Sequence, residues 1–571
     1  MNGLTIVLIS AAVFIVAYLV YGRWLAKTWG IDPKAKTPAY THEDGQDYIP
    51  TPKGIVFAHQ FSSIAGAGPV TGPIIAAVFG WLPALLWILI GGVFFGAVQD
   101  FTAMYASVKN EGKSIGLIIE RYIGKAGKQL FLAFSWIFSL LVIAAFADIV
   151  ATTFNGYKAG GALNTPSAAA ASISMIYIGG AVLFGLFLKF AKPKPVVMFV
   201  TGLALFFAML ALGIAFPMYA GKMTWLVIVF CYAFVASVVP MWILMQPRDY
   251  LSAYLLISMI ICAVAGVIVN RPTMNLPAFT GFTVGGKYLF PTLFVTIACG
   301  AISGFHSLVS SGTSSKQIRN EKDMLPTTYG AMLVESLLAV VAIVVAGSVA
   351  THGKLPNETP FVIFSSAVAN FLTAMGLPKK VALCFMTMCV SALALTTLDT
   401  VSRIGRMSWQ ELFIGSGEKP QNAFAKFITN KYVATVLTLF FGFLLSLGGY
   451  NNIWPLFGSA NQLLGALVLI ALAVFLKTTN RKGFMLWVPM FSMLAVTLTA
   501  LVMAVVSICK KIFVTGGFRF LTDGLQLIVA VLLLALSVMV AFHGFSRLFG
   551  KEKPQETAPA PESVGAGAGN P

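Results

Sequence analysis

Six ionisable side chains stand inside long apolar stretches of this sequence, where a charge is costly. They are two histidines and four carboxylic acids: His59, Asp100, Asp148, His306, Glu335 and Asp399. An ionisable group at membrane depth marks a functional site by default. Histidine has an unperturbed pKa of about 6.5 and therefore exchanges protons near neutral pH. We hypothesise that His59 and His306, with Asp100 as a carboxylate partner, let protons drive the movement of a solute.

Other chemistries are open at these positions. The two histidines could instead be buried and neutral, each hydrogen-bonded to a backbone carbonyl or a hydroxyl. Hydroxyl oxygens that would also suit a sodium ion occur at Ser303, Ser310 and Ser311. A metal ion held by both histidines and a carboxylate is disfavoured, because the ligand spacing of a metal site is not visible. We therefore expect no metal and no cofactor, only a coupling ion, H⁺ or Na⁺.

The carboxylic acids also have structural interpretations. Asp100 and Asp399 lie near the inside ends of their apolar stretches, where each could cap a loop or pair with a nearby Lys or Arg. Glu335 lies deeper, which favours a buried role, either in coupling or in a bond to a neighbouring helix. Further polar side chains within the apolar stretches are Gln99, Asp148, Asn461 and Gln462.

Residues 64–73 interrupt an otherwise apolar stretch with three glycines and two prolines, residues that break helices. Broken backbone is tolerated at membrane depth only where it is buried in protein or lines a cavity, and its free N–H groups suit an anionic passenger. The alternative is close helix packing through Gly and Ala, which explains the prolines less well. The predicted passenger site comprises Ser62, Ser63, Ala65, Gly66, Ala67, Gly68, Pro69 and Thr71.

The composition is typical of a polytopic membrane protein. Of the 571 residues, 58% are hydrophobic and 10% are charged, whereas soluble domains carry about 25% charged residues. The net charge of +18 arises from Lys and Arg in short loops, which is the positive-inside pattern and not a nucleic-acid-binding face. Six cysteines without a CxxC motif predict small buried side chains, not disulfides or a zinc site.

A transmembrane helix needs about 20 apolar residues. Residues 359–375 form a shorter stretch, expected to be re-entrant or interfacial, and the first stretch is expected to be a retained span. Fifteen spans are predicted, near 3–22, 54–79, 82–107, 129–153, 172–190, 195–216, 224–247, 250–270, 291–311, 326–350, 380–399, 432–448, 453–476, 484–508 and 523–546.

The distribution of basic residues predicts the orientation. With a periplasmic N-terminus and a cytoplasmic C-terminus, most of the 38 Lys and Arg residues lie on the cytoplasmic side. None is expected deep within a span. The charge of an anionic passenger would therefore be neutralised by helix dipoles, a co-transported cation or a protonated histidine.

A second interrupted stretch lies at 231–250, which carries Pro240 and Pro247. It begins five spans after the first and runs in the opposite direction, which is typical of an inverted repeat of five plus five helices. The alternative is that Pro240 only kinks a packed helix. In such a fold His59 and His306 lie on the first and eighth core helices and approach one cation position. The predicted parts are an accessory span at 1–22, repeats at 54–216 and 224–411, accessory spans at 432–546 and a disordered tail at 551–571.

Several long motifs resemble the carbon starvation protein A family over about residues 50–470: 59–69 (HQFSSIAGAGP), 96–100 (GAVQD), 246–250 (QPRDY), 301–307 (AISGFHS), 329–336 (YGAMLVES), 396–400 (TTLDT) and 454–462 (WPLFGSANQ). The resemblance implies a bacterial inner-membrane protein of the amino acid–polyamine–cation superfamily with a LeuT-like five-plus-five fold. It also implies proton-driven uptake of peptides or pyruvate, induced by carbon starvation. The chain has less sequence at its C-terminal end than the longest members, which leaves the accessory spans and the substrate preference open.

The sequence therefore predicts an all-α polytopic membrane protein that imports small carboxylates or short peptides by secondary transport. An enzyme is not expected, because no nucleophile motif, metal quartet or nucleotide loop occurs in the sequence. The expected partners are a small-molecule substrate and the lipid bilayer, without nucleic acid. A sodium-coupled symporter, a channel and a membrane sensor are the alternatives.

Overall fold

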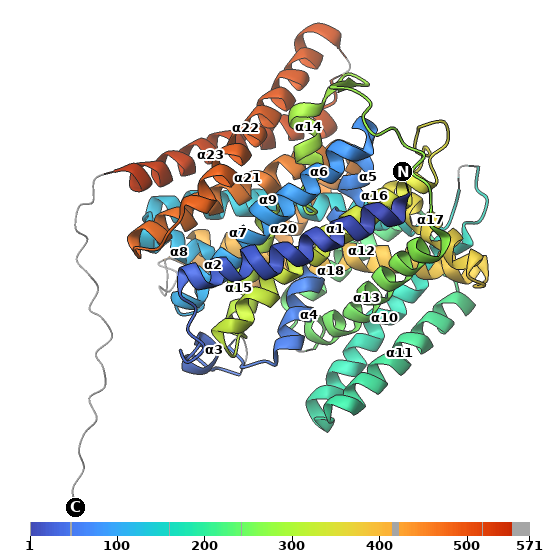
Figure 1. Ribbon diagram of the computed structural model, residues 1–571, viewed down its shortest axis with the longest axis horizontal. Helices are drawn as coiled ribbons and strands as arrows, with labels where there is room; N and C mark the ends of the chain where they lie inside the picture. The colour runs from blue at the N-terminus through green and yellow to red at the C-terminus, as the bar shows by residue number, and fades with distance from the viewer. Residues whose placement is uncertain are drawn as a thin grey trace, which may run out of the picture.

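The computed structural model describes residues 2–45, 48–158, 160–240, 243–413, 422–516 and 518–550. These residues form a helical bundle (Figure 1) with one small hairpin, in which β1 (Thr283–Val284) pairs antiparallel with β2 (Lys287–Tyr288) and Thr283 lies opposite Tyr288. The disordered tail predicted at 551–571 lies outside the described residues.

The apolar stretches become helices because a helix pairs its backbone N–H and C=O groups within one segment where water is absent. Short π-helical turns join some of them, as at Gly92–Gly96 between α6 and α7. In chain order the α-helices are α1 (Gly3–Ala17), α2 (Arg23–Trp29), α3 (Pro38–Thr41), α4 (Lys53–Ile64), α5 (Gly68–Ala76), α6 (Trp81–Gly91), α7 (Ala97–Lys109), α8 (Ile115–Tyr122), α9 (Lys125–Thr153), α10 (Thr165–Ala191), α11 (Pro195–Ala215), α12 (Lys222–Val238), α13 (Met245–Asn270), α14 (Leu289–Thr296), α15 (Gly304–Gly312), α16 (Ala331–Ser348), α17 (Pro360–Ala374), α18 (Lys379–Phe413), α19 (Ala423–Ile428), α20 (Lys431–Ser446), α21 (Tyr450–Thr478), α22 (Trp487–Lys510) and α23 (Leu525–Phe549).

Fewer helices reach spanning length than the fifteen that the sequence predicts. Among the described residues, 11 helices are long and apolar enough to cross a membrane, and the bent pair α4–α5 would make 12. The stretches at 224–247 and 291–311 are interrupted, and 432–448 forms only the 16 residues of α20. The short stretch at 359–375 is the 15-residue helix α17.

The predicted interruption within 64–73 is confirmed between α4 and α5. The two helices are bent by 42°, and Ala65 leaves the helical region with ψ of 65°. Pro69 lies in the first turn of α5, where a missing N–H sacrifices no helical hydrogen bond. Ala65 and Ala67 are both fully buried, so this broken backbone is enclosed by protein.

Two further interruptions follow. The one predicted at 231–250 is present, because α12 ends at Val238 and α13 begins at Met245, so the chain leaves the helix near Pro240 instead of only bending there. The other was not predicted: α14 ends at Thr296 and α15 begins at Gly304. Its signal in the sequence is the run of mostly small residues at 298–304 (ACGAISG).

The interruption between α4 and α5 packs directly against the one between α14 and α15. A Cβ atom on Gly68 would overlap Cys299. A Cβ atom on Gly72 would lie 2.5 Å from the carbonyl oxygen of Thr296. Only glycine allows the two segments to approach so closely at these positions.

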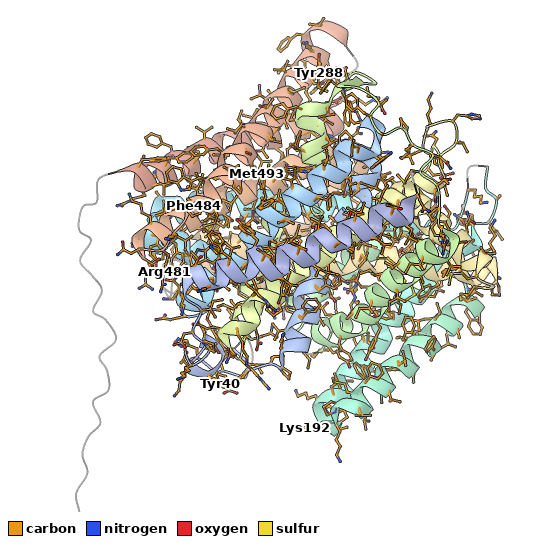
Figure 2. All side chains as sticks on the ribbon, viewed as in Figure 1. Tyr40, Lys192, Tyr288, Arg481, Phe484 and Met493 are labelled. Carbon is orange, nitrogen blue, oxygen red and sulfur yellow. The ribbon has the colours of Figure 1, made fainter. Side chains whose placement is uncertain are left out.

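The bundle has a buried centre and an apolar outer surface. In the most apolar 18-residue stretch of α21, 100% of the residues are buried. In the corresponding stretches of α11 and α23, only 22% and 28% of the residues are buried. In Figure 1 the pair α22 and α23 lies at one corner of the bundle and the pair α10 and α11 at the opposite corner. Outer apolar side chains such as Phe484, 62% exposed, project from the surface, and the charged Lys192 lies at the tip between α10 and α11 (Figure 2). This distribution is typical of helices that face lipid.

Candidate functional site

A histidine lies between two carboxylic acids inside the bundle. His306 of α15 has its Nδ1 3.1 Å from Oδ2 of Asp100 in α7, and its Nε2 3.4 Å from Oε2 of Glu335 in α16. All three side chains have 0% exposure. The structure thus brings together three of the residues predicted for coupling, which come from three helices. We call them the His306 cluster.

Hydrogen bonds from two neighbouring helices hold the start of α15. Asn461 of α21 accepts from the Ser303 hydroxyl at 3.1 Å and from the Phe305 N–H at 3.2 Å, and so caps the helix. Gln99 of α7 donates to the Ser303 carbonyl at 2.7 Å and to the Ser307 hydroxyl at 2.8 Å. The turn of α7 that anchors α15 through Gln99 therefore also presents the next residue, Asp100, to His306.

The His306 cluster is incompletely bonded. Oδ1 of Asp100 and both carboxylate oxygens of Glu335 make no hydrogen bond to any described residue. Buried polar atoms are nearly always paired, because an unpaired one loses its hydration without replacement. Additional protons or a cation would supply the missing partners. The arrangement can therefore take up and release positive charge.

Cys299, in the interrupted segment before α15, adds a thiol beside the cluster. Its Sγ and the ligand atoms of His306 and Glu335 lie within 4.8 Å of one another, so these three residues could hold a metal ion. Sequence reasoning missed Cys299, whose only signal is its place in the run of small residues. All six cysteines are free; three of them are buried, as predicted, whereas two are half-buried and Cys231 is exposed.

His59 lies in a different set of contacts. Its Nε2 is 3.2 Å from the Thr313 hydroxyl and its Nδ1 is 3.5 Å from Oδ2 of Asp249, and the side chain is 13% exposed. Thr313 follows His306 by seven residues, or about 10 Å along a helix. The described contacts thus give the two histidines separate partners, whereas the sequence places both at one cation position.

The serines considered for sodium already have protein partners. The Ser310 hydroxyl accepts from Nε2 of Gln60 at 2.9 Å. The Ser311 hydroxyl accepts from the Ile115 N–H at 3.2 Å and donates to the Ser307 carbonyl at 2.7 Å. These bonds hold α15 against α4 and the start of α8.

The predicted passenger segment is closely packed. Gly66 approaches Thr397 of α18, so the alternative of tight helix packing accounts for this glycine as it does for Gly68. Packing does not account for the buried hydroxyls of Ser62, Ser63 and Thr71, which have no hydrogen-bond partner among the described residues. These hydroxyls are available to a polar ligand.

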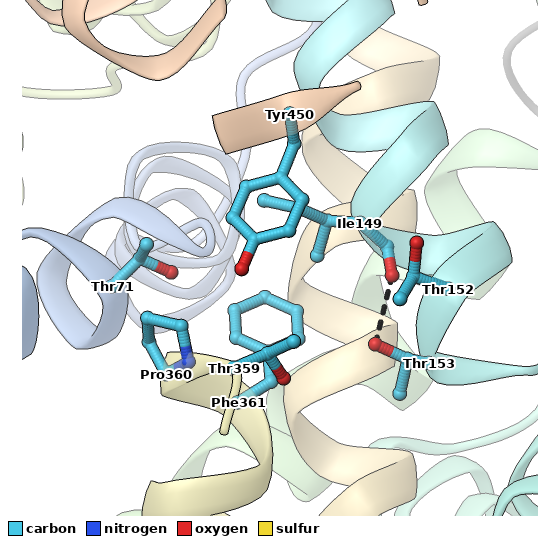
Figure 3. Close-up of a pocket in the computed structure, with 8 residues that line it drawn as sticks. All are labelled: Thr71, Ile149, Thr152, Thr153, Thr359, Pro360, Phe361 and Tyr450. Carbon is cyan, nitrogen blue, oxygen red and sulfur yellow. Dashed lines mark hydrogen bonds between the residues drawn. The ribbon is translucent and has the colours of Figure 1, made fainter. Parts of the chain in front are cut away.

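A hollow of about 220 Å³, including its mouth, reaches this segment from the ends of α9, α17 and α21. The hydroxyls of Thr71 and Tyr450 face into it (Figure 3). Its lining is Thr71, Ile149, Thr152, Thr153, Thr359, Pro360, Phe361 and Tyr450. The hollow thus connects the start of α17 with the passenger segment.

The expectation that no Lys or Arg lies within a span is wrong for Arg248. This side chain, near the start of α13, is 1% exposed and forms an ion pair with Asp399 of α18. Tyr232 of α12 donates a hydrogen bond of 2.5 Å to the same carboxylate. Pro240 and Pro247, which precede Arg248, suggest a loop in the sequence. In the structure, the interruption between α12 and α13 directs the Arg248 side chain into the protein interior. Pairing with an arginine is one of the two interpretations that the sequence allows for Asp399.

Two other polar residues join helices. Asp148 of α9 pairs with Lys222 at 2.8 Å through Oδ1 and accepts from the Tyr450 N–H at 2.9 Å through Oδ2. Gln462 of α21 donates to the Phe294 carbonyl of α14 at 2.5 Å. The contacts of Asp148 are those of a residue that fixes the start of α21.

Comparison with known proteins identifies the family. Residues 2–357 and 348–500 match the family model described as carbon starvation protein CstA. The chain belongs to this family. The peptide transporter CstA of Escherichia coli (strain K12) is 31% identical over 87% of this chain and 80% of its own length. The pyruvate/proton symporter BtsT of the same strain is 31% identical over 85% of this chain and 79% of its own length.

Further comparisons give a third relative and a distant match among solved structures. The peptide transporter CstA of Bacillus subtilis (strain 168) is 31% identical over 85% of this chain and 87% of its own length. Among solved structures, the crystal structure of the Eremococcus coleocola manganese transporter in complex with an aromatic bis-isothiourea substituted compound matches with a TM-score of 0.48 and 11% identity, over 88% of this chain and 99% of that one. The CstA-family chain is thus a multi-pass membrane transporter and not an enzyme.

Proposed function

We propose that this CstA-family chain is a proton-coupled symporter of the bacterial inner membrane, which imports a small carboxylate such as pyruvate, or a short peptide, during carbon starvation. The observation that carries the proposal is His306 between Asp100 and Glu335, fully buried and with unpaired carboxylate oxygens. The names of the relatives support it, because they include peptide transporters and a pyruvate/proton symporter.

Protons at the His306 cluster would change the charge where three helices meet. With both acids ionised and His306 neutral, two like charges lie in a fully buried site, which is unfavourable. Each proton taken up removes part of this cost. The protonated cluster therefore favours the closed packing of α7, α15 and α16, and loss of protons favours an arrangement that admits water.

The passenger is proposed to bind at the interruption of α4–α5. The free N–H groups at the start of α5 and the positive end of its dipole suit a carboxylate, and nearby hydroxyls at Ser62, Ser63 and Thr71 are unpaired. Gly68 packs against Cys299 of the segment that leads into α15. Binding at α5 and protonation at α15 would therefore act on the same helix crossing, which is what coupling requires.

Sodium coupling is the competing proposal. A sodium ion needs several oxygen atoms that point to one place, and the hydroxyls of Ser310 and Ser311 are instead engaged with Gln60, Ile115 and Ser307. Asp100 and Glu335 do have unpaired oxygens, and these lie next to a side chain that itself binds protons. These contacts favour H⁺ over Na⁺.

We further infer an inverted five-plus-five repeat with a cytoplasmic C-terminus. The interrupted helices α4–α5 and α14–α15 cross at Gly68 and Cys299, as the first helices of two inverted repeats would. This pairing would start the second repeat at α14 instead of residue 224. The basic residues concentrated in the loops assigned to the cytoplasm support the orientation.

Uptake into proteoliposomes tests the proposed function. Labelled pyruvate and a labelled dipeptide are offered with an imposed inward proton gradient, in sodium-free buffer, with an uncoupler as the control. The proposal expects accumulation of one of them that collapses with the uncoupler. Accumulation that appears only with a sodium gradient would contradict proton coupling, and flux without accumulation under any gradient would indicate a channel.

A further inference from the structure

An arginine in the last third of α18 lies inside the protein without a counter-charge. Arg406 is 8% exposed, and it makes no hydrogen bond and no ion pair with any residue that the structure describes. Its Nε–H is itself buried and unpaired. A buried charge without a partner is costly, because it loses its hydration without replacement. Neither the His306 cluster nor the passenger segment accounts for this side chain.

The elements around Arg406 bring more positive charge to it. The helices α12, α18 and α20 pack against one another (Figure 1). One turn before Arg406, Arg403 donates from Nη2 to the Val239 carbonyl at 2.6 Å. From the start of α20, Lys431 donates from Nζ to the Val238 carbonyl at 2.9 Å. Among the described residues, the charge that acts on Arg406 is that of Arg403, a second cation.

Helix capping explains two of these three cations. The last carbonyls of a helix lack N–H partners within it and form the negative end of its dipole, and Arg403 and Lys431 bond those at the end of α12. Arg406 adds no bond there. On its other side, Trp409 donates to the Ile428 carbonyl of α19 at 3.0 Å. Arg406 thus lies between the contacts of α18 with α12 and with α19, and its charge calls for an anion from outside the described chain.

The position of Arg406 along α18 places it at the level of the lipid headgroups. The helix begins with Lys379 and Lys380, which are both exposed. Arg406 lies about 40 Å further along the helix axis, and a bilayer with its headgroup regions is about 40–45 Å thick. The two ends of this span therefore reach opposite surfaces of the membrane, and Arg406 lies at one of them.

Exposed apolar side chains surround this end of the bundle. On α20, Tyr432, Val436 and Phe440 are all exposed, and their spacing of four residues places them in one stripe that begins beside the lysine. On α19, Phe424 and Phe427 are also exposed. Acyl chains would cover these surfaces, whereas a free phosphate ion in water would gain nothing from them.

We propose that Arg406, with Arg403 and Lys431, binds the phosphate group of an anionic phospholipid whose acyl chain lies along the stripe of α20. A guanidinium matches a phosphate with two parallel hydrogen bonds, and basic pockets between membrane helices are typical sites for such headgroups. Three cations favour a lipid with a net negative charge over a zwitterionic one. The lipid supplies the counter-charge that Arg406 lacks and joins the ends of α12, α18 and α20. The site is independent of the proposed transport function.

Thermal unfolding of the purified, delipidated full-length protein in a neutral detergent tests the proposal. Dioleoylphosphatidylglycerol is added to the micelles. Dioleoylphosphatidylcholine, which has the same chains and no net charge, is the comparison lipid, and inorganic phosphate represents the soluble source of the same group. A ligand that binds only the folded state raises the unfolding temperature. We expect phosphatidylglycerol to raise it, and phosphatidylcholine and inorganic phosphate to leave it near the value without additions.

Arg406→Gln is the decisive variant, because it removes the charge and keeps a polar side chain. Without lipid it should unfold at a temperature no lower than the wild type, since it removes an uncompensated buried charge. The shift caused by phosphatidylglycerol should be lost. Retention of labelled phosphatidylglycerol by the immobilised protein should show an affinity at least about tenfold weaker, the usual order for loss of a charge-assisted hydrogen bond.

Arg319→Gln is the matched control. It removes the same charge from the loop after α15, where Arg319 donates to the Pro50 carbonyl at an exposed position, so it should bind phosphatidylglycerol like the wild type. Should Arg406→Gln fail to fold, Lys431→Gln decides, because this lysine is only half-buried at the edge of the site. We expect Lys431→Gln to lose affinity severalfold.

Three results would overturn the inference: a wild-type response to phosphatidylglycerol in a folded Arg406→Gln protein, the same response in Lys431→Gln, or equal effects of the two lipids on the wild type. Stabilisation by inorganic phosphate alone would also overturn it, because the site would then belong to a soluble anion. Since no substrate and no gradient enter these measurements, failure of the transport proposal would leave their outcome unchanged.

Discussion

Two buried acidic sites in this protein differ in how completely they are bonded. At Asp148 each carboxylate oxygen has a partner, Lys222 on one side and the Tyr450 N–H on the other. In the His306 cluster one oxygen of Asp100 and both oxygens of Glu335 make no hydrogen bond to a described residue. Both aspartates are nearly inaccessible, at 2% and 0% exposure.

Burial alone therefore does not mark a buried acid as functional; the completeness of its hydrogen bonding does. A buried carboxylate with a complete set of partners fixes two helices together, and its charge does not need to change. A buried carboxylate with unpaired oxygens is stable only in a protonation or ion-bound state that supplies the missing partners. We therefore assign coupling to the His306 cluster and structural support to Asp148, and the following variants test this division.

The largest effect is expected for His306→Asn. Asparagine keeps a polar side chain of similar shape but cannot carry a proton at neutral pH. Proton-driven accumulation in proteoliposomes should fall to the level of protein-free vesicles, while exchange of substrate across the membrane without a gradient persists. Loss of both activities together with loss of cooperative unfolding would indicate a structural role instead.

Glu335→Gln should have the next largest effect. The variant removes one of the two acids of the cluster without changing its size, and Asp100 keeps its contact of 3.1 Å with His306. Accumulation should be reduced, and its dependence on external pH should weaken, because the cluster has one proton-binding group fewer. A pH profile of initial uptake rates that matches the wild type would remove Glu335 from the mechanism.

A smaller effect is expected for His59→Asn. His59 contacts Thr313 and Asp249, and it is partly exposed. Asparagine can still hydrogen-bond Thr313, so substrate accumulation should decrease only in part and should keep its dependence on the proton gradient. Complete loss of gradient-driven uptake, as severe as in His306→Asn, would show that the two histidines form one coupling unit after all.

Asp148→Asn should change stability more than transport. The amide can accept from the Tyr450 N–H but loses the ion pair with Lys222, whose side chain is 44% exposed. Such partly exposed pairs contribute up to about 1 kcal/mol, which in a chain of this length lowers the unfolding temperature by about 1 °C at most, while accumulation stays near the wild-type level. Strong loss of proton coupling in a folded Asp148→Asn protein would erase the distinction between the two sites.

The smallest effect is expected for Cys299→Ser combined with a metal chelator. If protons alone serve the cluster, neither the substitution nor EDTA should change the uptake rate by a measurable amount. Inhibition by EDTA that is restored by one added divalent metal, and lost in Cys299→Ser, would instead show that Cys299, His306 and Glu335 hold an ion.

Local sequence signals predict part of this site well. The glycines and prolines of 64–73 indicate the interruption of α4–α5, and the ionisable residues in apolar stretches indicate Asp100, His306 and Glu335 as candidates. Both signals depend on physical costs that are independent of the tertiary fold: broken helices and buried charges are expensive in a bilayer. The structure accordingly contains the interruption of α4–α5 and places Asp100, His306 and Glu335 in contact.

The partners could not be predicted, because they depend on which helices pack together. Arg248 directly follows Pro247 and resembles a loop residue, yet the interruption between α12 and α13 buries it against Asp399. His59 and His306 lie on helices that meet, but the contact runs through Thr313 and gives each histidine its own partners. The sequence does not predict the break before α15, because this segment contains no proline.

Proton coupling through the His306 cluster is tested most directly by proton flux itself. Proteoliposomes that hold a pH-sensitive dye are given substrate on the outside without an imposed gradient, and internal acidification is followed in the wild type, His306→Asn and Asp148→Asn. Proton coupling through His306 predicts substrate-dependent acidification in the wild type and in Asp148→Asn, and none in His306→Asn. Acidification of wild-type size in a folded His306→Asn protein, which exchanges substrate at the normal rate, would contradict it.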